Sequence, residues 1–274
     1  MSAGAAGAAT VPGRSGGPGR FTAGFRDAAA AEWLKLRSLR STWWTLAATF
    51  VLTVAVGLLY GTTIGNHPED YRKDVFDPVL MGFAGVSMSQ MAIVCFGVMA
   101  VSGEYTTGTI RASLTAVPDR TVFWAAKAAV VGAVALAVSL PTAFATFFAA
   151  QTSMGSELNA GLGDPGALRA TFGLALHLTL LCLVSAGVAA VLRGTVITLG
   201  VLVPLFFIVG DLLASLPGVG QVARFLPNIA GSRLMSTVPD SRIGYGPGPG
   251  LLVILAWTCV ALACGLAALR RRDA

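Results

Sequence analysis

The sequence predicts an all-α integral membrane protein with six transmembrane helices, an N-terminal amphipathic interfacial helix, and both termini in the cytoplasm. Hydrophobic residues make up 55% of the chain and charged residues only 12%, whereas about 25% of a soluble domain is charged. Residues 78–103, 128–156 and 243–269 carry no charge at all. Each of these stretches is long enough to cross about 30 Å of hydrocarbon as a helix, which satisfies its own backbone hydrogen bonds there.

The chain divides into three predicted regions. Residues 1–24 are rich in Gly, Ala, Ser and Pro, lack an apolar run long enough for a signal peptide, and are expected to form a disordered cytoplasmic tail. Residues 25–41 are expected to form the interfacial helix, and residues 42–270 the transmembrane domain. Pro141 is expected to kink the third span or to mark its outer end. The spans are expected at about residues 42–63, 79–101, 122–150, 170–192, 195–216 and 251–269.

The distribution of Lys and Arg predicts the orientation of these spans. Thirteen of the nineteen basic residues fall on one side of the predicted membrane and six on the other, so the first side is expected to face the cytoplasm. The cytoplasmic set is Arg14, Arg20, Arg26, Lys35, Arg37, Arg40, Arg111, Arg120, Lys127, Arg193, Arg270, Arg271 and Arg272. The outer set is Arg72, Lys73, Arg169, Arg224, Arg233 and Arg242.

Neither the net charge nor the cysteines indicate another class of protein. The net charge of +6 does not point to nucleic acid, because the basic residues gather near span ends. The cysteines lie in apolar stretches without metal-ligand spacing, so no metal site is expected and they are predicted to be small core residues. They are Cys95, Cys182, Cys259 and Cys264.

The segment before the first span has helical periodicity. Lys35 and Arg37 lie off its apolar face, as expected for a helix lying flat at the cytoplasmic interface with its cations toward anionic lipid. Glu32 falls on the apolar face and is predicted to pair with a basic residue of a cytoplasmic loop. A basic flank that only sets the topology is the alternative interpretation. The apolar face contains Phe25, Ala29, Trp33, Leu36 and Leu39.

The inner loop between the second and third spans, residues 103–120, also predicts a short amphipathic helix. Ile110, Leu114 and Val117 are spaced as on one helix face, Thr106 or Thr107 is suited to cap its start, and Pro118 is suited to end it. Glu104 falls where the second span meets the inner interface. Its carboxylate therefore needs a donor there, such as Arg111 or nearby backbone amides.

Three features together resemble a known family, the type-2 ATP-binding-cassette (ABC) transporter permeases. The first is EWLKLRS at residues 32–38, followed by Trp43 and Trp44 at the entry to the first span. The second is an E-x-x-x-G-T core at Glu104, Gly108 and Thr109, followed by Pro118. The third is the six-span layout. The resemblance covers nearly the whole chain beyond the tail.

The resemblance implies a permease subunit of the plasma membrane that exports a small molecule, drug or lipid. The working unit would be two permeases, expected as a homodimer, with two cytoplasmic ABC ATPase subunits. The outer segment after the fifth span resembles the family's short re-entrant helices. Residues 25–40, with Glu32, Trp33, Lys35, Leu36 and Arg37, resemble its interfacial connecting helix. The family also has a coupling helix, which docks on the ATPase. The residues that resemble this coupling helix are Glu104, Tyr105, Thr106, Gly108, Thr109, Ile110, Arg111, Leu114 and Pro118.

No G-x-x-x-x-G-K-[ST] motif occurs in the sequence. The chain is therefore not expected to be an enzyme or to bind a cofactor, and ATP and Mg are expected on the partner ATPase.

His177 and Asp211 are the clearest ionisable residues within the predicted spans, so they are candidate intramembrane polar sites. A neutral, hydrogen-bonded His177 and a solvated Asp211 are one interpretation. A proton-coupled secondary transporter that uses both residues is the alternative function. An intramembrane enzyme is a poorer third hypothesis, because the sequence has only two histidines and no H-E-x-x-H motif. Small residues within the spans, such as Gly97, Gly132 and Gly187, are expected to permit close helix packing, and pore lining is the alternative interpretation of these residues.

Overall fold

The computed structural model describes residues 18–71, 76–215, 220–238 and 244–271. These residues form helices joined by turns, and no β-strand occurs among them, which confirms the all-α class. Five of the helices are long and apolar enough to cross a membrane by length and composition. They are α2 (Arg40–Asn66), α4 (Val86–Thr107), α6 (Arg120–Ser153), α7 (Ala167–Leu192) and α12 (Pro247–Arg271).

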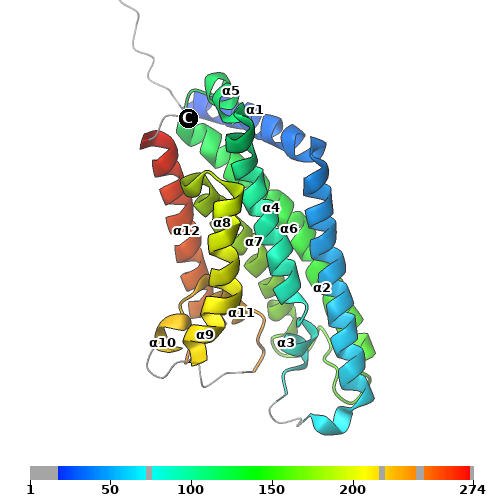
Figure 1. The fold of residues 1–274 in the computed structure, drawn as a ribbon. Helices are drawn as coiled ribbons and strands as arrows, with labels where there is room; N and C mark the ends of the chain where they lie inside the picture. The colour runs from blue at the N-terminus through cyan, green and yellow to red at the C-terminus, as the bar shows by residue number, and fades with distance from the viewer. Residues whose placement is uncertain (1–17, 72–75, 216–219, 239–243, 272–274) are drawn as a thin grey trace, which may run out of the picture.

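The long apolar helices run side by side, and other helices lie at both ends of the bundle (Figure 1). One end carries α1 (Pro18–Ser38), which lies across the bundle, together with α5 (Thr109–Ala116) and the end of α12. Helix α7 is the centre of the bundle: 78% of its most apolar part is buried, against 22% for α12. The opposite end carries η1 (Pro68–Asp70), α3 (Pro78–Gly82), α9 (Gly210–Ser215), α10 (Gly220–Ala223) and α11 (Pro227–Ser232).

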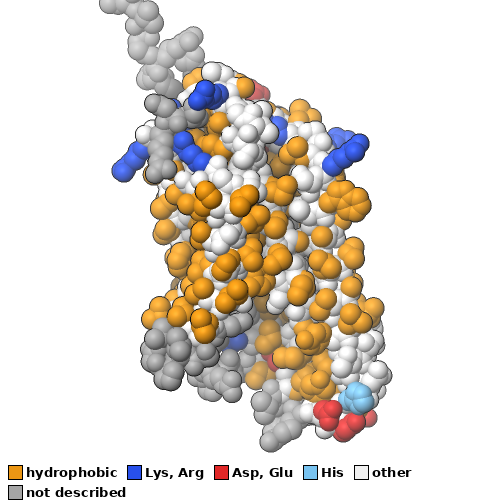
Figure 2. Space-filling model, in the orientation of Figure 1, with side chains coloured by type: hydrophobic (Ala, Val, Ile, Leu, Met, Phe, Trp, Pro, Cys, Tyr) orange, Lys and Arg blue, Asp and Glu red, His pale blue; other side chains and the backbone are white. Residues whose placement is uncertain are grey.

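The surface of the bundle is apolar between two polar ends. Figure 2 shows hydrophobic side chains over the middle, Lys and Arg at the end with α1 and α5, and acidic residues with a histidine at the other end. An exposed apolar surface of this extent is unusual for a soluble monomer and suits contact with lipid tails. Among its most exposed members are Trp44, Leu59, Val196 and Leu252.

Four expected spans fall within α2, α6, α7 and α12. Each of these helices begins a few residues earlier than expected, and α6 continues through Pro141 to Ser153. The expectation that Pro141 marks an outer end is therefore wrong. A proline inside a membrane helix is tolerated because neighbouring helices and side chains compensate for its missing hydrogen bond.

The region of the expected fifth span is built from three helical pieces. They are α8 (Thr195–Pro204), the π-helical turn η2 (Leu205–Val209) and α9 (Gly210–Ser215). Pro204 lies at the junction of α8 and η2. Since proline has no N–H to donate, the i to i−4 hydrogen-bond pattern is broken there, and a wider turn follows.

The expected second span, residues 79–101, differs from the structure. Helix α3 ends at Gly82, a turn covers residues 83–85, and α4 runs from Val86 to Thr107. Asp77 caps α3, because its carboxylate accepts a hydrogen bond from the Leu80 amide at 2.9 Å. The long helix is thus shifted toward the basic end, so that Glu104 lies in the last turns of α4 rather than in a loop.

The N-terminal boundary also differs. Residues 1–17 of the expected tail lie outside the described residues, but residues 18–24 are helical and belong to α1. Pro18 is compatible with this start, since the first helical position needs no N–H donor. The helix ends at Ser38, and Leu39 has extended backbone angles, φ −85° and ψ 118°. This one extended residue makes the corner between α1 and α2.

Short helices follow α9, as the resemblance implied. Pro227, Ala230 and Gly231 of α11 are buried, and α11 packs against α7 and α12. The chain after α11 is held by the buried Asp77 carboxylate, which accepts hydrogen bonds from the Thr237 amide at 2.6 Å and the Val238 amide at 3.0 Å. Asp77 therefore joins the start of α3 to the segment that precedes α12.

Two of the expected close approaches occur where a glycine permits them. A Cβ at Gly97 of α4 would lie 2.5 Å from the Cys182 carbonyl oxygen of α7, and one at Gly187 would lie 2.5 Å from the Ala261 carbonyl carbon of α12. Gly132 is different, because a Cβ there would meet only the Leu183 side chain at 3.4 Å.

We predict that Gly97→Ala destabilises the bundle by about 2 kcal/mol, the cost of forcing a packed backbone apart. Gly200→Ala is the matched control, since it is helical and exposed and a Cβ there meets nothing within 4 Å. Thermal unfolding in detergent, followed by size-exclusion fluorescence, measures both. Equal midpoints for the two variants would contradict the packing argument.

Candidate functional site

Four charged side chains meet at the basic end of the bundle. They are Glu32 and Lys35 of α1, Glu104 of α4 and Lys127 of α6. The Lys35 ammonium lies 2.6 Å from Glu32 Oε1 and 2.8 Å from Glu104 Oε1. Lys127 Nζ lies 2.9 Å from Glu104 Oε1 and also donates to Glu32 Oε2. We call these four residues the charge cluster; its two positive and two negative charges cancel.

The charge cluster is largely removed from water. Lys127 is 2% exposed, Glu32 4% and Glu104 8%. An isolated charge at such depth costs several kcal/mol, so each of these groups depends on its partners. The cluster also includes a neutral contact, because Lys35 Nζ donates to Ser113 Oγ of α5 at 2.9 Å. A single network therefore joins α1, α4, α5 and α6.

Lys35 is the most accessible member of the cluster, with a side chain 37% exposed. Burial lowers its pKa, but the hydrogen bonds and negative charges of Glu104 and Glu32 outweigh that effect and raise the pKa above its usual value. The ammonium is therefore charged at neutral pH.

The packing of Glu32 differs from the one predicted from the sequence. Among residues 24–38 of α1, whose side chains the structure describes, those buried against the bundle are Ala28, Glu32 and Leu36, four apart in sequence. Trp33 and Leu39 are 48% and 47% exposed, and Arg37 is exposed. Glu32 therefore lies at the middle of the packed stripe, whereas Trp33 and Leu39 of the expected apolar face are largely exposed. The basic partners of Glu32 come from its own helix and from α6 rather than from a loop.

Sequence analysis does not identify Lys127 as a member of the cluster, because it uses this residue only to predict the orientation of the spans. Both donors to the Glu104 carboxylate, Lys35 and Lys127, also differ from the expected candidates. A signal was available: Lys127 lies seven residues inside α6, where an unpaired ammonium would be costly, so it needed a carboxylate.

Gly108 separates α4 from α5. Its φ of 72° and ψ of 2° are in the left-handed region, which costs a residue with a side chain about 1–2 kcal/mol. The expected Thr cap is wrong, because Gly108 occupies the cap position and no side chain caps α5. The Thr106 and Thr107 hydroxyls instead donate to the Gly103 carbonyl at 3.0 and 2.8 Å.

Helix α5 is amphipathic, as expected. Ile110 is 5% exposed, and Leu114 and Val117 pack against the same core. The helix ends at Ala116, before Pro118, and Asp119 then caps α6 by accepting from the Thr121 amide at 2.8 Å. Hydrogen bonding from the Thr121 amide lowers the pKa of Asp119. The face of α5 that points outward contains Arg111, Ala112, Thr115 and Ala116.

The last turns of α4 are also held on their other side. The Arg193 guanidinium lies over the Tyr105 ring, 5.2 Å from its centroid. Arg193 caps the end of α7 with a φ of 57°, so Tyr105 links α4 to the connection between α7 and α8. Both sides of the α4 end are thus fixed before the chain turns at Gly108.

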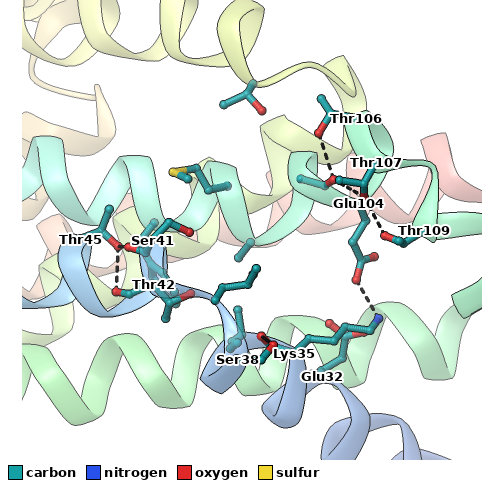
Figure 3. Close-up of a pocket in the computed structure, with 17 residues that line it drawn as sticks. Glu32, Lys35, Ser38, Ser41, Thr42, Thr45, Glu104, Thr106, Thr107 and Thr109 are labelled. Atoms are coloured by element: carbon teal, nitrogen blue, oxygen red, sulfur yellow. Dashed lines mark hydrogen bonds and ion pairs between the residues drawn. The ribbon is translucent and has the colours of Figure 1, made fainter.

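A cavity of about 510 Å³ lies beside the charge cluster, between the corner of α1 and α2 and the end of α4. Figure 3 shows Lys35, Glu32 and Glu104 together at one part of its wall and Thr42 and Thr45 at another. Its apolar lining includes Leu36, Leu39, Phe96 and Met99. Hydroxyl groups come from Ser38, Ser41, Thr42, Thr45, Thr106, Thr107, Thr109 and Thr195.

His177, one of the two candidate intramembrane sites, is not part of the charge cluster. His177 of α7 is fully buried, and its Nε2 lies 2.6 Å from Gln90 Nε2 of α4. A Cβ at Gly231 would lie 1.9 Å from His177 Nδ1, so α11 packs directly on the imidazole. The side chain of Asp211 lies outside the described residues. Among the described residues, no group of three or more His, Cys, Asp or Glu could hold a metal ion.

Comparison with known families gives a match over most of the chain. The sequence model of the ABC-2 family transporter protein matches residues 29–210. These residues include the charge cluster, Gly108 and α5. A search among curated proteins found no match.

We predict that Lys127→Met destabilises the protein by about 3 kcal/mol, because it leaves two buried carboxylates short of a positive charge. The double variant Glu32→Gln with Lys127→Met restores charge balance and should recover part of that loss. Thermal unfolding in detergent provides the double-mutant cycle. Strictly additive effects of the two substitutions would show that the pair is not coupled.

Proposed function

This chain belongs to the ABC-2 transporter family, and we propose that it is the permease subunit of an exporter driven by ATP hydrolysis on a separate cytoplasmic ATPase. The observation that carries the proposal is the geometry of α5. Its outer face, Arg111, Ala112, Thr115 and Ala116, is exposed at the basic end, while its inner face rests on the core. A second protein can therefore reach α5 without unfolding any part of the bundle.

The distribution of charge supports the proposed orientation. The end with α1 and α5 is the basic end of the bundle, and basic residues are retained on the cytoplasmic side of membranes. In this orientation α5, both termini and the charge cluster face the cytoplasm, and α11 lies at the outer side. The interrupted helix formed by α8, η2 and α9 would be the fifth span in chain order and would bring the total to six.

The contacts of α5 support a mechanism for transmitting force. If the ATPase displaces α5, the Ser113 contact and the hinge at Gly108 transmit the displacement to the charge cluster. The cluster joins α1, α4 and α6, so these helices would move together rather than one at a time. Such a rigid-body motion is the usual way in which a small local displacement changes the state of a helical bundle.

The remaining parts of the proposal follow from the family. The chain would contribute no bond-breaking chemistry, since it has no phosphate-binding motif. ATP and Mg would be bound by the partner, and two copies of this chain would form the pathway in the plasma membrane. The exposed apolar side chains of α2 and α8, among them Leu59, Val196 and Ile197, leave room for both lipid and a second copy.

We predict that Arg111→Glu lowers the amount of ATPase that copurifies with the tagged chain from its native host by about tenfold, because it reverses a charge at the centre of the docking face. Arg271→Glu is the control, since it makes the same change at the same end of the bundle outside α5. The copurified chain must contain a phosphate-binding loop and hydrolyse ATP. Equal recovery with both variants would contradict docking on α5.

Proton-coupled transport is the alternative function, and it assigns a role to His177 that a substitution can test. Its polar partner is the neutral amide of Gln90, which can hold a neutral imidazole without a proton relay. We therefore predict that His177→Asn retains ATP-dependent transport within about threefold, because it removes no charge pair. Transport by the unmodified chain in vesicles, driven by a pH gradient without any ATPase, would favour the alternative.

A further inference from the structure

The cavity beside the charge cluster has two chemically different parts. Glu32, Lys35 and Glu104 are its charged residues. Phe96 and Met99 lie further along α4, and the eight residue steps from Phe96 to Glu104 span about 12 Å of helix. A molecule that fills the cavity must therefore have a polar head and an apolar body.

Lys35, the cation that borders the cavity, has no hydrogen-bond donor left to offer. An ammonium carries three N–H groups. Here they are directed to Glu32 Oε1 at 2.6 Å, Glu104 Oε1 at 2.8 Å and Ser113 Oγ at 2.9 Å. An anionic head group would have to displace one of these contacts and would also lie against two carboxylates.

Glu104, by contrast, has acceptor capacity left. Its Oε1 receives both Lys35 and Lys127, while its Oε2 is buried without a hydrogen-bond partner among the described residues. Leaving a buried charged oxygen unpaired is unfavourable, so a donor that reaches it is stabilised. The terminal torsion of a glutamate is soft, which allows a small rotation to present Oε2 to a donor in the cavity.

Three of the eight hydroxyl groups in the cavity wall also offer acceptors rather than donors. Thr45 donates its hydroxyl proton to the backbone carbonyl of Ser41 at 2.9 Å, and Thr106 and Thr107 donate theirs to the Gly103 carbonyl. A hydroxyl that has given its only proton still has two lone pairs. These three hydroxyls can therefore accept a hydrogen bond from a bound molecule but cannot donate one.

We infer that this cavity binds a membrane amphiphile whose head group donates hydrogen bonds and carries no negative charge, such as a long-chain amine. The head would lie against Glu104 and the apolar body along Phe96 and Met99. As an assignment of substrate class, the inference rests on the proposed function. The bound molecule would also lie against Thr107 and Thr109, on both sides of the Gly108 hinge. Its occupancy would thus be sensed where α5 joins the bundle.

Photolabelling of the purified full chain in lipid nanodiscs, without any ATPase, tests the inference. The probes are a diazirine-bearing long-chain alkylamine, the carboxylate of the same chain length, and a short-chain diazirine amine that stays in water. We expect the long-chain amine to label residues 96–109 about tenfold more than either other probe, the factor supplied by one charge-assisted hydrogen bond. Excess unlabelled long-chain amine should abolish that labelling.

Two glycines provide a matched pair of variants. Gly103 borders the cavity and Gly200 does not, and at both positions an added Cβ meets nothing within 4 Å. Gly103→Leu should therefore reduce amine labelling by about tenfold, while Gly200→Leu should leave it unchanged. If Gly103→Leu fails to fold, the comparison of the three probes on the unmodified chain still tests the inference.

Equal labelling by the amine and the carboxylate, equal labelling by the short-chain amine, or full labelling of Gly103→Leu would each overturn the inference. None of these results depends on the ATPase. Loss of ATPase docking on α5 with intact amine labelling would count against the proposed function alone, and the reverse result against the cavity assignment alone.

Discussion

A charge in a medium that cannot solvate it must be neutralised by a partner, and this requirement organises the basic end of the molecule. Glu32, Lys127 and Glu104 are nearly inaccessible to water, and none of them is stable there alone. Their pairing brings together residues separated by 69 and 95 positions in the chain. The position of α1 across the bundle is a direct consequence, since α1 supplies two of the four charges.

The same principle operates at the opposite end with a single carboxylate. Asp77 is 6% exposed and accepts hydrogen bonds from the Leu80, Thr237 and Val238 amides. It therefore connects the segment before α4 to the segment before α12. Between these ends the helices are joined by contacts of small residues, such as Gly97 against Cys182. In an apolar solvent, close packing of this kind replaces the hydrophobic effect as the source of helix association.

The contacts of α4 connect the two ends of the bundle. Helix α4 has the charge cluster, Tyr105 and Gly108 at its basic end, and Gln90 beside His177 further along. Its two halves are thus fixed to different neighbours, α1 and α6 at one end and α7 toward the other. A displacement that enters at α5 would reach the α11 side through α4 and α7, which form one of the most extensive helix contacts in the described chain.

Local features of the sequence were sufficient to predict many of the helices and part of the candidate site. Hydropathy and length located four of the five long helices to within a few residues, because membrane thickness constrains each span independently of its neighbours. Periodicity identified α5 and its buried Ile110, and the need for a partner was recognised for Glu32 and Glu104. The family resemblance depended on the same short-range patterns, and the match over residues 29–210 confirms it.

Tertiary structure alone decided which charges pair, where α4 begins, and what the cavity offers to a ligand. The position of Lys127 inside α6 indicates that it needs a carboxylate but not which one, because the rotation of α6 about its axis sets which side its ammonium faces. Lys35 has an acceptor for each of its three N–H groups, and Glu104 Oε2 has no hydrogen-bond partner among the described residues. Both properties depend on distances among four helices. Spacing along one helix reports on that helix, whereas the balance of donors and acceptors in a shared site exists only after the helices have packed.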